Sequence, residues 1–251
     1  YVPLHPRNEF RMLPSDISRK ITKKTKMIII NSPHNPTGSV INEDDIIKIV
    51  RIAEKHGLFL LTDEVYSKII FEENHFSASY FDHCQEHTII LNSFSKLYSM
   101  SGWRLGYAIG PKELIGKMGL LLQTTLSCLP AFTQMAAISV LKNNDTDYVD
   151  KLVKEYTRRR DLIMEGLKNV PGIKYIKPKG AFYIYPELEN SKFSGHEYSE
   201  KILKEEGICL LPGECFGENG KGFLRLSYAQ TSIDTIQIAI EKIINFHNKY
   251  Y

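Results

Sequence analysis

The sequence is poor in the residues that build metal centres and disulfide frameworks. Its 251 residues include four cysteines, Cys84, Cys128, Cys209 and Cys215, and no two of them are spaced as Cys-x-x-Cys. The eight histidines are scattered without a metal-ligand spacing. We therefore expect no metal site, and we expect reduced, mostly buried thiols in a cytoplasmic protein.

Long apolar runs and an excess of one charge are absent too. No run approaches the roughly 20 apolar residues that a membrane helix requires. The 32 lysines and arginines nearly balance the 29 aspartates and glutamates, which leaves a formal net charge of +3. This balance argues against nucleic acid and membranes as partners. With 43% hydrophobic and 24% charged residues, the composition is that of a globular protein.

Short apolar runs alternate with helical patterns in the first half of the chain. Residues 27–31, 58–62 and 88–92 are apolar runs that predict buried strands. Between the first two, residues 42–56 predict a helix, because Asn42 is a good N-cap, acidic residues follow it and Gly57 ends the pattern. Strands that alternate with helices in this way indicate an α/β sheet with helices on both faces.

A fourth strand over residues 105–109 differs from the first three. Only about a dozen residues separate it from the third strand, and several of them are polar. This leaves too little room for a parallel crossover helix, so we expect the fourth strand to run antiparallel. The predicted fold is a mixed, mostly parallel sheet in a domain over residues 1–149, followed by a smaller α+β domain over residues 150–251.

The second domain is predicted from a long helix and several short strands. The helix runs over 148–169 and carries Arg158, Arg159 and Arg160, which we interpret as a solvated face. Residues 173–176 and 181–185 resemble a hairpin. The remaining predicted elements are a helix over 196–206, strands near 208–211 and 223–228, and a final helix that begins at Ser232.

Polar side chains follow each of the first three strands. Asn35 follows the first strand, Asp63 and Tyr66 follow the second, and Ser93 and Lys96 follow the third. Ligands of open α/β sheets bind outside the carboxyl ends of the strands, so we expect these side chains to converge on one crevice. Arg104 precedes the antiparallel strand, which starts at the same edge.

This set of residues suits one kind of cofactor. Lysine is the side chain that forms Schiff bases with carbonyl groups. A pyridoxal phosphate site requires such a lysine, an acid for the pyridine nitrogen, donors for the phenolate oxygen and a cation for the phosphate. The predicted crevice contains a candidate for each.

Four motifs along the chain resemble one family. They are NSPHNPTG (31–38), DEVY (63–66), SFSKLYSMSGWRLGY (93–107) and PGECFGENGKGFLRLSYA (212–229). In this order they resemble fold-type I pyridoxal phosphate-dependent aminotransferases of the aspartate and aromatic class I/II group. The resemblance spans about residues 20 to 245 and implies a sheet of the seven-stranded type. It also implies that this chain lacks the family's N-terminal part.

The resemblance implies a role for each candidate residue. Lys96 would form the Schiff base and move protons, Asp63 would hold the pyridine nitrogen protonated, and Tyr66 and Asn35 would donate to the phenolate oxygen. Ser93 and Arg104 would bind the phosphate, and Arg225 would bind the substrate α-carboxylate together with Asn35. The catalytic residues would be Lys96 and Tyr66.

The implied reaction is ping-pong transamination between an amino acid and a 2-oxo acid in a cytoplasmic homodimer. Carbon–sulfur β-lyases and aminocyclopropane-carboxylate synthases have the same fold, and the four motifs do not separate them. An inactive fragment, or an aminotransferase-like ligand-binding domain such as occurs behind a winged helix in some regulators, also stays open.

Overall fold

The computed structural model describes residues 1–82, 86–143, 146–168 and 170–250. The chain divides into two compact units. Unit 1 comprises residues 1–2, 11–33 and 40–150, and unit 2 comprises residues 3–10, 34–39 and 151–251. Two short N-terminal stretches therefore belong to the same unit as the C-terminal hundred residues.

Unit 1 contains a four-stranded sheet in the order β1 (Met27–Asn31), β2 (Phe59–Asp63), β3 (Thr88–Ser93), β4 (Gly106–Ile109). The pairs β1–β2 and β2–β3 are parallel, and β3–β4 is antiparallel. The prediction of an antiparallel fourth strand is confirmed, and so is the mixed α/β fold class.

Helix α2 (Glu43–His56) has the two ends that the sequence predicts. The Asn42 side chain accepts a hydrogen bond from the Asp45 backbone N–H at 2.9 Å, and Gly57 ends the helix in the left-handed conformation with φ 60°. Its buried Ile46 and Ile49 pack with Ile30 of β1 and Leu60 of β2. Each such buried side chain stabilises the fold by about 2 kcal/mol, so α2 is held by its apolar face.

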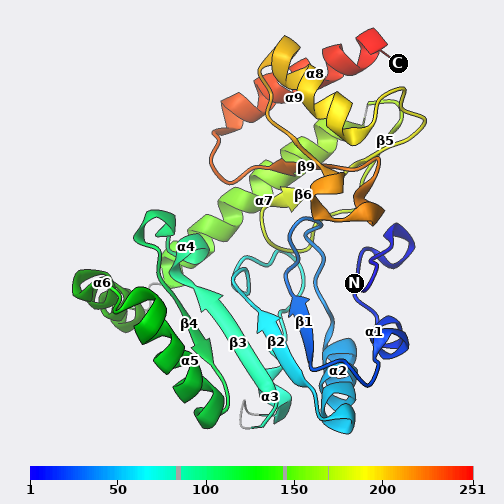
Figure 1. The fold of residues 1–251 in the computed structure, drawn as a ribbon. Helices are drawn as coiled ribbons and strands as arrows, with labels where there is room; N and C mark the ends of the chain where they lie inside the picture. Colours follow the sequence, from blue (N-terminus) through cyan, green and yellow to red (C-terminus); the bar gives the residue numbers. More distant parts are fainter. Residues whose placement is uncertain (83–85, 144–145, 169, 251) are drawn as a thin grey trace. The chain divides into compact units, whose positions relative to one another are not determined.

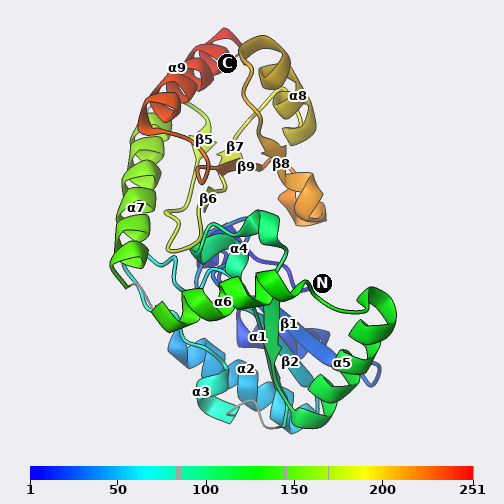
Figure 2. The same ribbon diagram turned by 90° about the vertical axis from the view of Figure 1, so that its left-hand side faces the viewer.

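The other helices of unit 1 flank the sheet near its two edge strands, β1 and β4. Figures 1 and 2 show α1 (Pro14–Lys20) and α2 on one side, and α5 (Lys112–Leu126) and α6 (Ala131–Asn143) beyond β4 on the other. Shorter segments complete the unit: α3 (Ser79–Asp82), α4 (Phe94–Leu97) and the 3-10 turn η2 (Ser101–Trp103). Helices α5 and α6 expose Leu120, Leu121, Phe132 and Met135 by 64–70% each.

In the part of unit 2 that the structure describes, three helices combine with two small sheets. Helix α7 (Thr146–Lys168) begins in unit 1 and continues into unit 2, which also contains α8 (Gly195–Glu206) and α9 (Ile233–Tyr250). One sheet pairs β5 (Ile173–Lys174) with β7 (Glu187–Leu188), and the other has the order β6 (Tyr183–Ile184), β9 (Leu224–Ser227), β8 (Leu211–Pro212). The 3-10 turns η1 (Pro6–Asn8), η3 (Gly213–Phe216) and η4 (Glu218–Gly220) complete unit 2.

Three expectations are wrong in detail. Residues 173–176 and 181–185 do not form a hairpin, because β5 pairs with β7 while β6 pairs with β9. Arg160 is 1% exposed and donates to the Pro178 carbonyl at 3.1 Å, and Arg159 donates to the Ala229 carbonyl at 2.9 Å. These two arginines are tertiary contacts rather than a solvated face.

The cysteines are the third case. Cys128, Cys209 and Cys215 are free and exposed, whereas the composition predicts buried thiols. Cys84 lies outside the described residues. Over the part of the chain that the structure describes, no helix has the length and apolar character to cross a membrane.

A close backbone approach in unit 2 leaves no room for a side chain at Gly213. A Cβ atom at this position would overlap the Gly220 carbonyl oxygen and lie 2.6 Å from the Tyr185 hydroxyl. We expect Gly213→Ala to lower the free energy of unfolding by about 3 kcal/mol, measured by urea denaturation. Gly116→Ala is the matched control, because among the described residues no atom outside the local backbone of α5 lies within 4 Å of its Cβ position. It should raise stability by about 0.5–1 kcal/mol, and equal effects of the two changes would contradict the packing argument.

Candidate functional site

Two of the predicted site residues share one face of the unit 1 sheet. Asp63 is the last residue of β2 and pairs in register with Leu91 of β3, two residues before Ser93. Side chains alternate between faces along a strand, so Asp63 and Ser93 lie on the same face. Strand spacing and rise place their Cα atoms about 8 Å apart. The two residues can therefore contact one small ligand.

Asp63 is a carboxylate in a partly desolvated position. Its Oδ1 accepts a hydrogen bond from the Val65 backbone N–H at 3.3 Å. Burial, with a smaller contribution from the charge of Glu64, raises the pKa of Asp63 above its ordinary value, and the Val65 N–H opposes this change. No lysine, arginine or histidine of the described residues forms an ion pair with Asp63. Its electrostatic environment suits a cationic ligand group.

Ser93 and Lys96 are brought together by a short helix. Ser93 is the N-cap of α4, and its hydroxyl oxygen accepts a hydrogen bond from the Ser95 backbone N–H at 3.1 Å. The same hydroxyl lies 2.9 Å from Ser95 Oγ and 3.1 Å from the Leu105 carbonyl oxygen. Lys96 lies within α4 and is half-buried. The end of β3 thus presents a serine and a lysine from one turn of the chain.

Tyr66 and Arg104 complete the predicted residues of unit 1. Tyr66 is 4% exposed and follows Asp63 by three residues. Arg104 is exposed, and its backbone has φ 54°, a left-handed conformation that costs a non-glycine residue about 1 kcal/mol. Its Nη1 donates to the Ser101 carbonyl at 2.9 Å, and no carboxylate among the described residues pairs with it. Arg104 is therefore a cation that an anion can approach.

The other two predicted residues lie together in unit 2. Arg225 on β9 donates from Nη1 to Asn35 Oδ1 at 2.9 Å, although 190 positions separate the two residues. Asn35 belongs to a tight turn in which the His34 N–H donates to the Ser39 carbonyl at 2.9 Å. Burial lowers the pKa of the neighbouring His34 side chain to about 4. The convergence of Asn35 with Asp63 in one crevice stays a prediction.

The donor set of unit 1 fits pyridoxal phosphate. The half-buried carboxylate of Asp63 suits a protonated pyridine nitrogen, and the exposed guanidinium of Arg104 suits a phosphate. Lys96 supplies the amine that such a cofactor requires, directly after β3. Within the described stretches, no cluster of histidine, cysteine and acidic residues could hold a metal ion.

A separate pocket of about 500 Å³ lies on the opposite face of the same sheet. Ile90, Asn92, Tyr107 and Ile109 line it, and their strand register places all four on the face that Asp63 and Ser93 do not share. None of the seven predicted residues lines this pocket. It is consequently a different site from the one that the motifs define.

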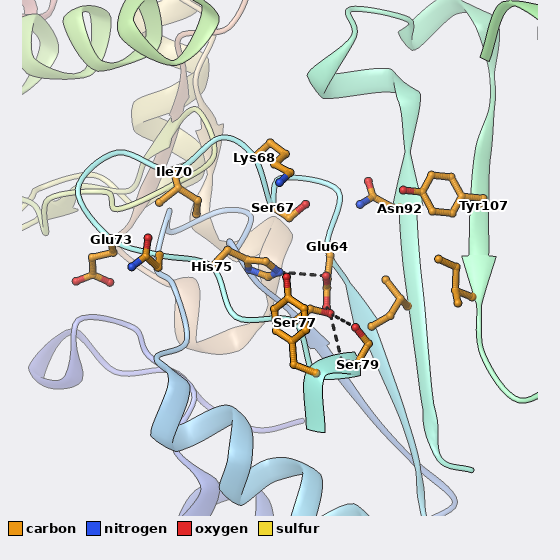
Figure 3. Close-up of a pocket in the computed structure, with 14 residues that line it drawn as sticks. Glu64, Ser67, Lys68, Ile70, Glu73, His75, Ser77, Ser79, Asn92 and Tyr107 are labelled. Atoms are coloured by element: carbon orange, nitrogen blue, oxygen red, sulfur yellow. Dashed lines mark hydrogen bonds and ion pairs between the residues drawn. The ribbon is translucent and has the colours of Figure 1, made fainter. Parts of the chain in front are cut away.

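This pocket contains a polar cluster that sequence reasoning missed. Figure 3 shows His75 and Ser77 directed toward Glu64, which is 6% exposed. His75 Nε2 lies 3.1 Å from Glu64 Oε2, and Ser77 Oγ donates to Glu64 Oε1 at 2.8 Å. The sequence does contain a signal for this cluster. Successive side chains at the end of a strand point to opposite faces, so Glu64 must lie on the face of the sheet opposite Asp63.

The chain resembles known aminotransferases over nearly its whole length. The family model described as "Aminotransferase class I and II" matches residues 1–243. The sequence is 38% identical to aspartate aminotransferase of Pyrococcus abyssi over 244 residues, which covers 96% of this chain and 62% of that protein. It is 36% identical to aromatic-amino-acid aminotransferase 2 of Thermococcus litoralis, with the same two coverages of 96% and 62%.

Solved structures agree with these sequences. The aromatic aminotransferase from Pyrococcus horikoshii OT3 is 36% identical with a TM-score of 0.93, and the match covers 99% of this chain and 66% of that one. Aspartate aminotransferase from Thermus thermophilus with maleate is 34% identical with a TM-score of 0.92, covering 97% and 63%. The chain spans about 62% of the length of the first curated relatives that it matches.

Proposed function

Because the chain belongs to the aminotransferase class I and II family, we propose that it transfers an amino group between an amino acid and a 2-oxo acid with pyridoxal phosphate, by a ping-pong mechanism. The observation that carries this proposal is the placement of Lys96 directly after β3, beside the strand that ends in Asp63. When bound, pyridoxal phosphate supplies a conjugated ring that accepts electrons from the substrate Cα.

Lys96 and Asp63 have complementary tasks in this proposal. Lys96 would hold the cofactor through its Nζ atom, and the free Lys96 amine would move a proton to and from the substrate Cα. Asp63 accepts a hydrogen bond from the pyridine N–H and keeps that proton in place. The raised pKa of Asp63 supports this task, because a cationic partner would stabilise the charged carboxylate that burial disfavours.

The remaining residues bind and orient. The Tyr66 hydroxyl and the Asn35 amide donate to the phenolate oxygen, and Ser93 and Arg104 bind the phosphate. Arg225 and Asn35 bind the substrate α-carboxylate. Their 2.9 Å hydrogen bond supports this pairing, since it holds both side chains at one place in unit 2.

We propose that residues 1–149 are the C-terminal part of the large cofactor-binding domain and that residues 150–251 are the small domain. We further propose a cytoplasmic homodimer. The apolar side chains exposed on α5 and α6 support an interface there, because contiguous exposed apolar surface marks interaction sites.

The function is tested by titrating the 251-residue chain with pyridoxal phosphate, reducing the complex with borohydride and mapping the modified peptide by mass spectrometry. We expect saturable binding and one modified residue, Lys96. Products formed from L-aspartate with 2-oxoglutarate are then compared with products formed from cystathionine. Release of pyruvate from cystathionine without need of a 2-oxo acid would replace transamination by β-lyase chemistry, and the absence of saturable cofactor binding would overturn the proposal.

A further inference from the structure

The guanidinium of Arg225 contacts two aromatic rings within unit 2. Its Cζ atom is 4.7 Å from the centroid of the Tyr183 ring on β6 and 4.9 Å from the centroid of the Phe216 ring at the end of η3. Both distances are inside the range in which a cation is attracted by the face of an aromatic ring. The planar guanidinium also stacks well on such rings, so two aromatic contacts hold the Arg225 side chain.

The edges of the guanidinium are only partly used. Nη1 donates to Asn35 Oδ1 at 2.9 Å. The buried Nε–H has no hydrogen-bond acceptor, and no carboxylate pairs with Arg225, among the residues that the structure describes. A buried donor without an acceptor is costly, and a bound carboxylate would satisfy it. Arg225 as a whole is only half-buried, so the unused edge of its guanidinium is where we place a carboxylate.

The two rings are held with different firmness. Tyr183 is 5% exposed, whereas Phe216 is 37% exposed. Phe216 contacts the Tyr185 ring edge-on at 6.2 Å between centroids, and Tyr185 in turn stacks on Phe223 at 5.0 Å. Phe216 is therefore an outer wall that rests on an aromatic cluster, and Tyr183 is a buried inner wall.

We propose that Phe216 and Tyr183 are positioning residues that fix the plane of the Arg225 guanidinium, so that its free edge is ready to receive the α-carboxylate of the amino acid or 2-oxo acid. The proposal rests on the proposed function for the identity of the ligand. The geometry that carries it lies within unit 2 alone.

The physical reason is pre-organisation. An unrestrained arginine side chain has many rotamers, and ordering it upon ligand binding weakens affinity. Contacts with two rings reduce the orientations open to the guanidinium, and the hydrogen bond to the Asn35 amide oxygen reduces them further. Leucine in place of Phe216 keeps apolar bulk but offers no aromatic face, so the loss should appear in carboxylate affinity and not in folding.

The test is calorimetric titration of the cofactor-free 251-residue chain with succinate, with succinamide as the uncharged probe. We expect Phe216→Leu to weaken succinate binding about tenfold with an unchanged melting temperature. Phe216→Tyr and Phe216→Trp, which keep an aromatic face, should bind succinate as the wild type does. None of these substitutions should change the binding of succinamide, which has no carboxylate for Arg225 to recognise.

Arg225→Ala separates the outcomes. If Arg225→Ala abolishes succinate binding while Phe216→Leu binds as tightly as the wild type, the positioning role is overturned and the carboxylate site stands. If Phe216→Leu fails to fold, weak succinate binding by a folded Phe216→Tyr or Phe216→Trp variant overturns the role instead. If Arg225→Ala binds succinate like the wild type, the carboxylate site itself is wrong, whatever the cofactor titration shows.

Discussion

Under the proposed function, Lys96→Ala is expected to yield a folded chain that retains no covalently bound cofactor and has lost the proposed amino-group transfer by about 10⁴-fold. The methyl group of alanine can neither form the covalent bond nor move a proton at the substrate Cα. The measurements are the absorbance of the chain after pyridoxal phosphate is added and the modified peptide after borohydride reduction.

Lys68→Ala is the matched control for this loss. Lys68 is exposed, follows β2 and lines the pocket on the opposite face of the sheet. It should bind cofactor and be modified at Lys96 like the wild type. Modification that persists in Lys96→Ala, at Lys68 or elsewhere, would mean that another lysine carries the cofactor.

Non-covalent binding adds a second measurement on the same variant. Asp63 and Arg104 are unchanged in Lys96→Ala, so pyridoxal phosphate should still bind reversibly, with an affinity set by the ring and phosphate contacts. A Lys96→Ala chain that has lost reversible binding as well as covalent binding would show that the substitution disturbed the site and not only its chemistry.

The parts of the fold that follow from local rules were predictable from the sequence. Helix α2 has a capping asparagine before it and a glycine after it, and both ends are found where these residues place them. The antiparallel direction of β4 follows from chain length, because the segment after β3 is occupied by α4 and η2. These signals are contained within a few neighbouring residues.

The errors come from contacts between residues far apart in the sequence. Strand β5 has two residues, and its partner β7 is not its nearest neighbour in the chain, so no local pattern gives the pairing. The burial of Arg160 is compensated by the Pro178 carbonyl and the Asp161 carboxylate, which a run of three arginines does not reveal. The aromatic rings around Arg225 likewise come from two segments, β6 and η3, more than 30 positions apart.

The candidate site divides in the same way. Strand ends indicate Asp63, Ser93 and Lys96, because parallel strands place their carboxyl ends at one edge. The family motifs are needed for the role of Arg225, and no local pattern predicts the Asn35–Arg225 hydrogen bond. The strand ends and motifs predict a function for Asp63 and none for Glu64. Strand alternation nevertheless places these two neighbouring acids on opposite faces of the sheet, so Glu64 needs an interpretation of its own.

Asp63→Asn is expected to have opposite effects on function and on stability. Asparagine has nearly the shape of aspartate and can still accept the Val65 N–H, but it is uncharged and cannot hold the pyridine nitrogen protonated. Removing one partner of such a charged contact should slow the proposed amino-group transfer by roughly 10²- to 10³-fold. Asp63→Glu, which keeps the charge at a longer reach, is the control and should retain more activity than Asp63→Asn.

Whereas Asp63→Asn should lower activity, it should raise the free energy of unfolding of the cofactor-free chain. Burial raises the folded pKa of Asp63 above its ordinary value of 3.8, so the folded chain binds this proton more tightly than the unfolded chain. Below the ordinary pKa both states are protonated and Asp63 has no such effect, whereas above the folded pKa the ionised carboxylate lowers the free energy of unfolding. Asp63→Asn should therefore be more stable than the wild type at pH 7, and the difference should vanish near pH 3.

Urea denaturation at the two pH values, with and without pyridoxal phosphate, measures the difference in the free energy of unfolding between the wild type and Asp63→Asn. Saturating cofactor should stabilise the wild type more than Asp63→Asn, because only the wild type gains a cationic partner for its carboxylate. The advantage of the variant at pH 7 should shrink or reverse when the cofactor is present. If Asp63→Asn is less stable than the wild type at pH 7 without cofactor, Asp63 has an ionic partner within the protein itself, and its carboxylate is not held ready for a ligand.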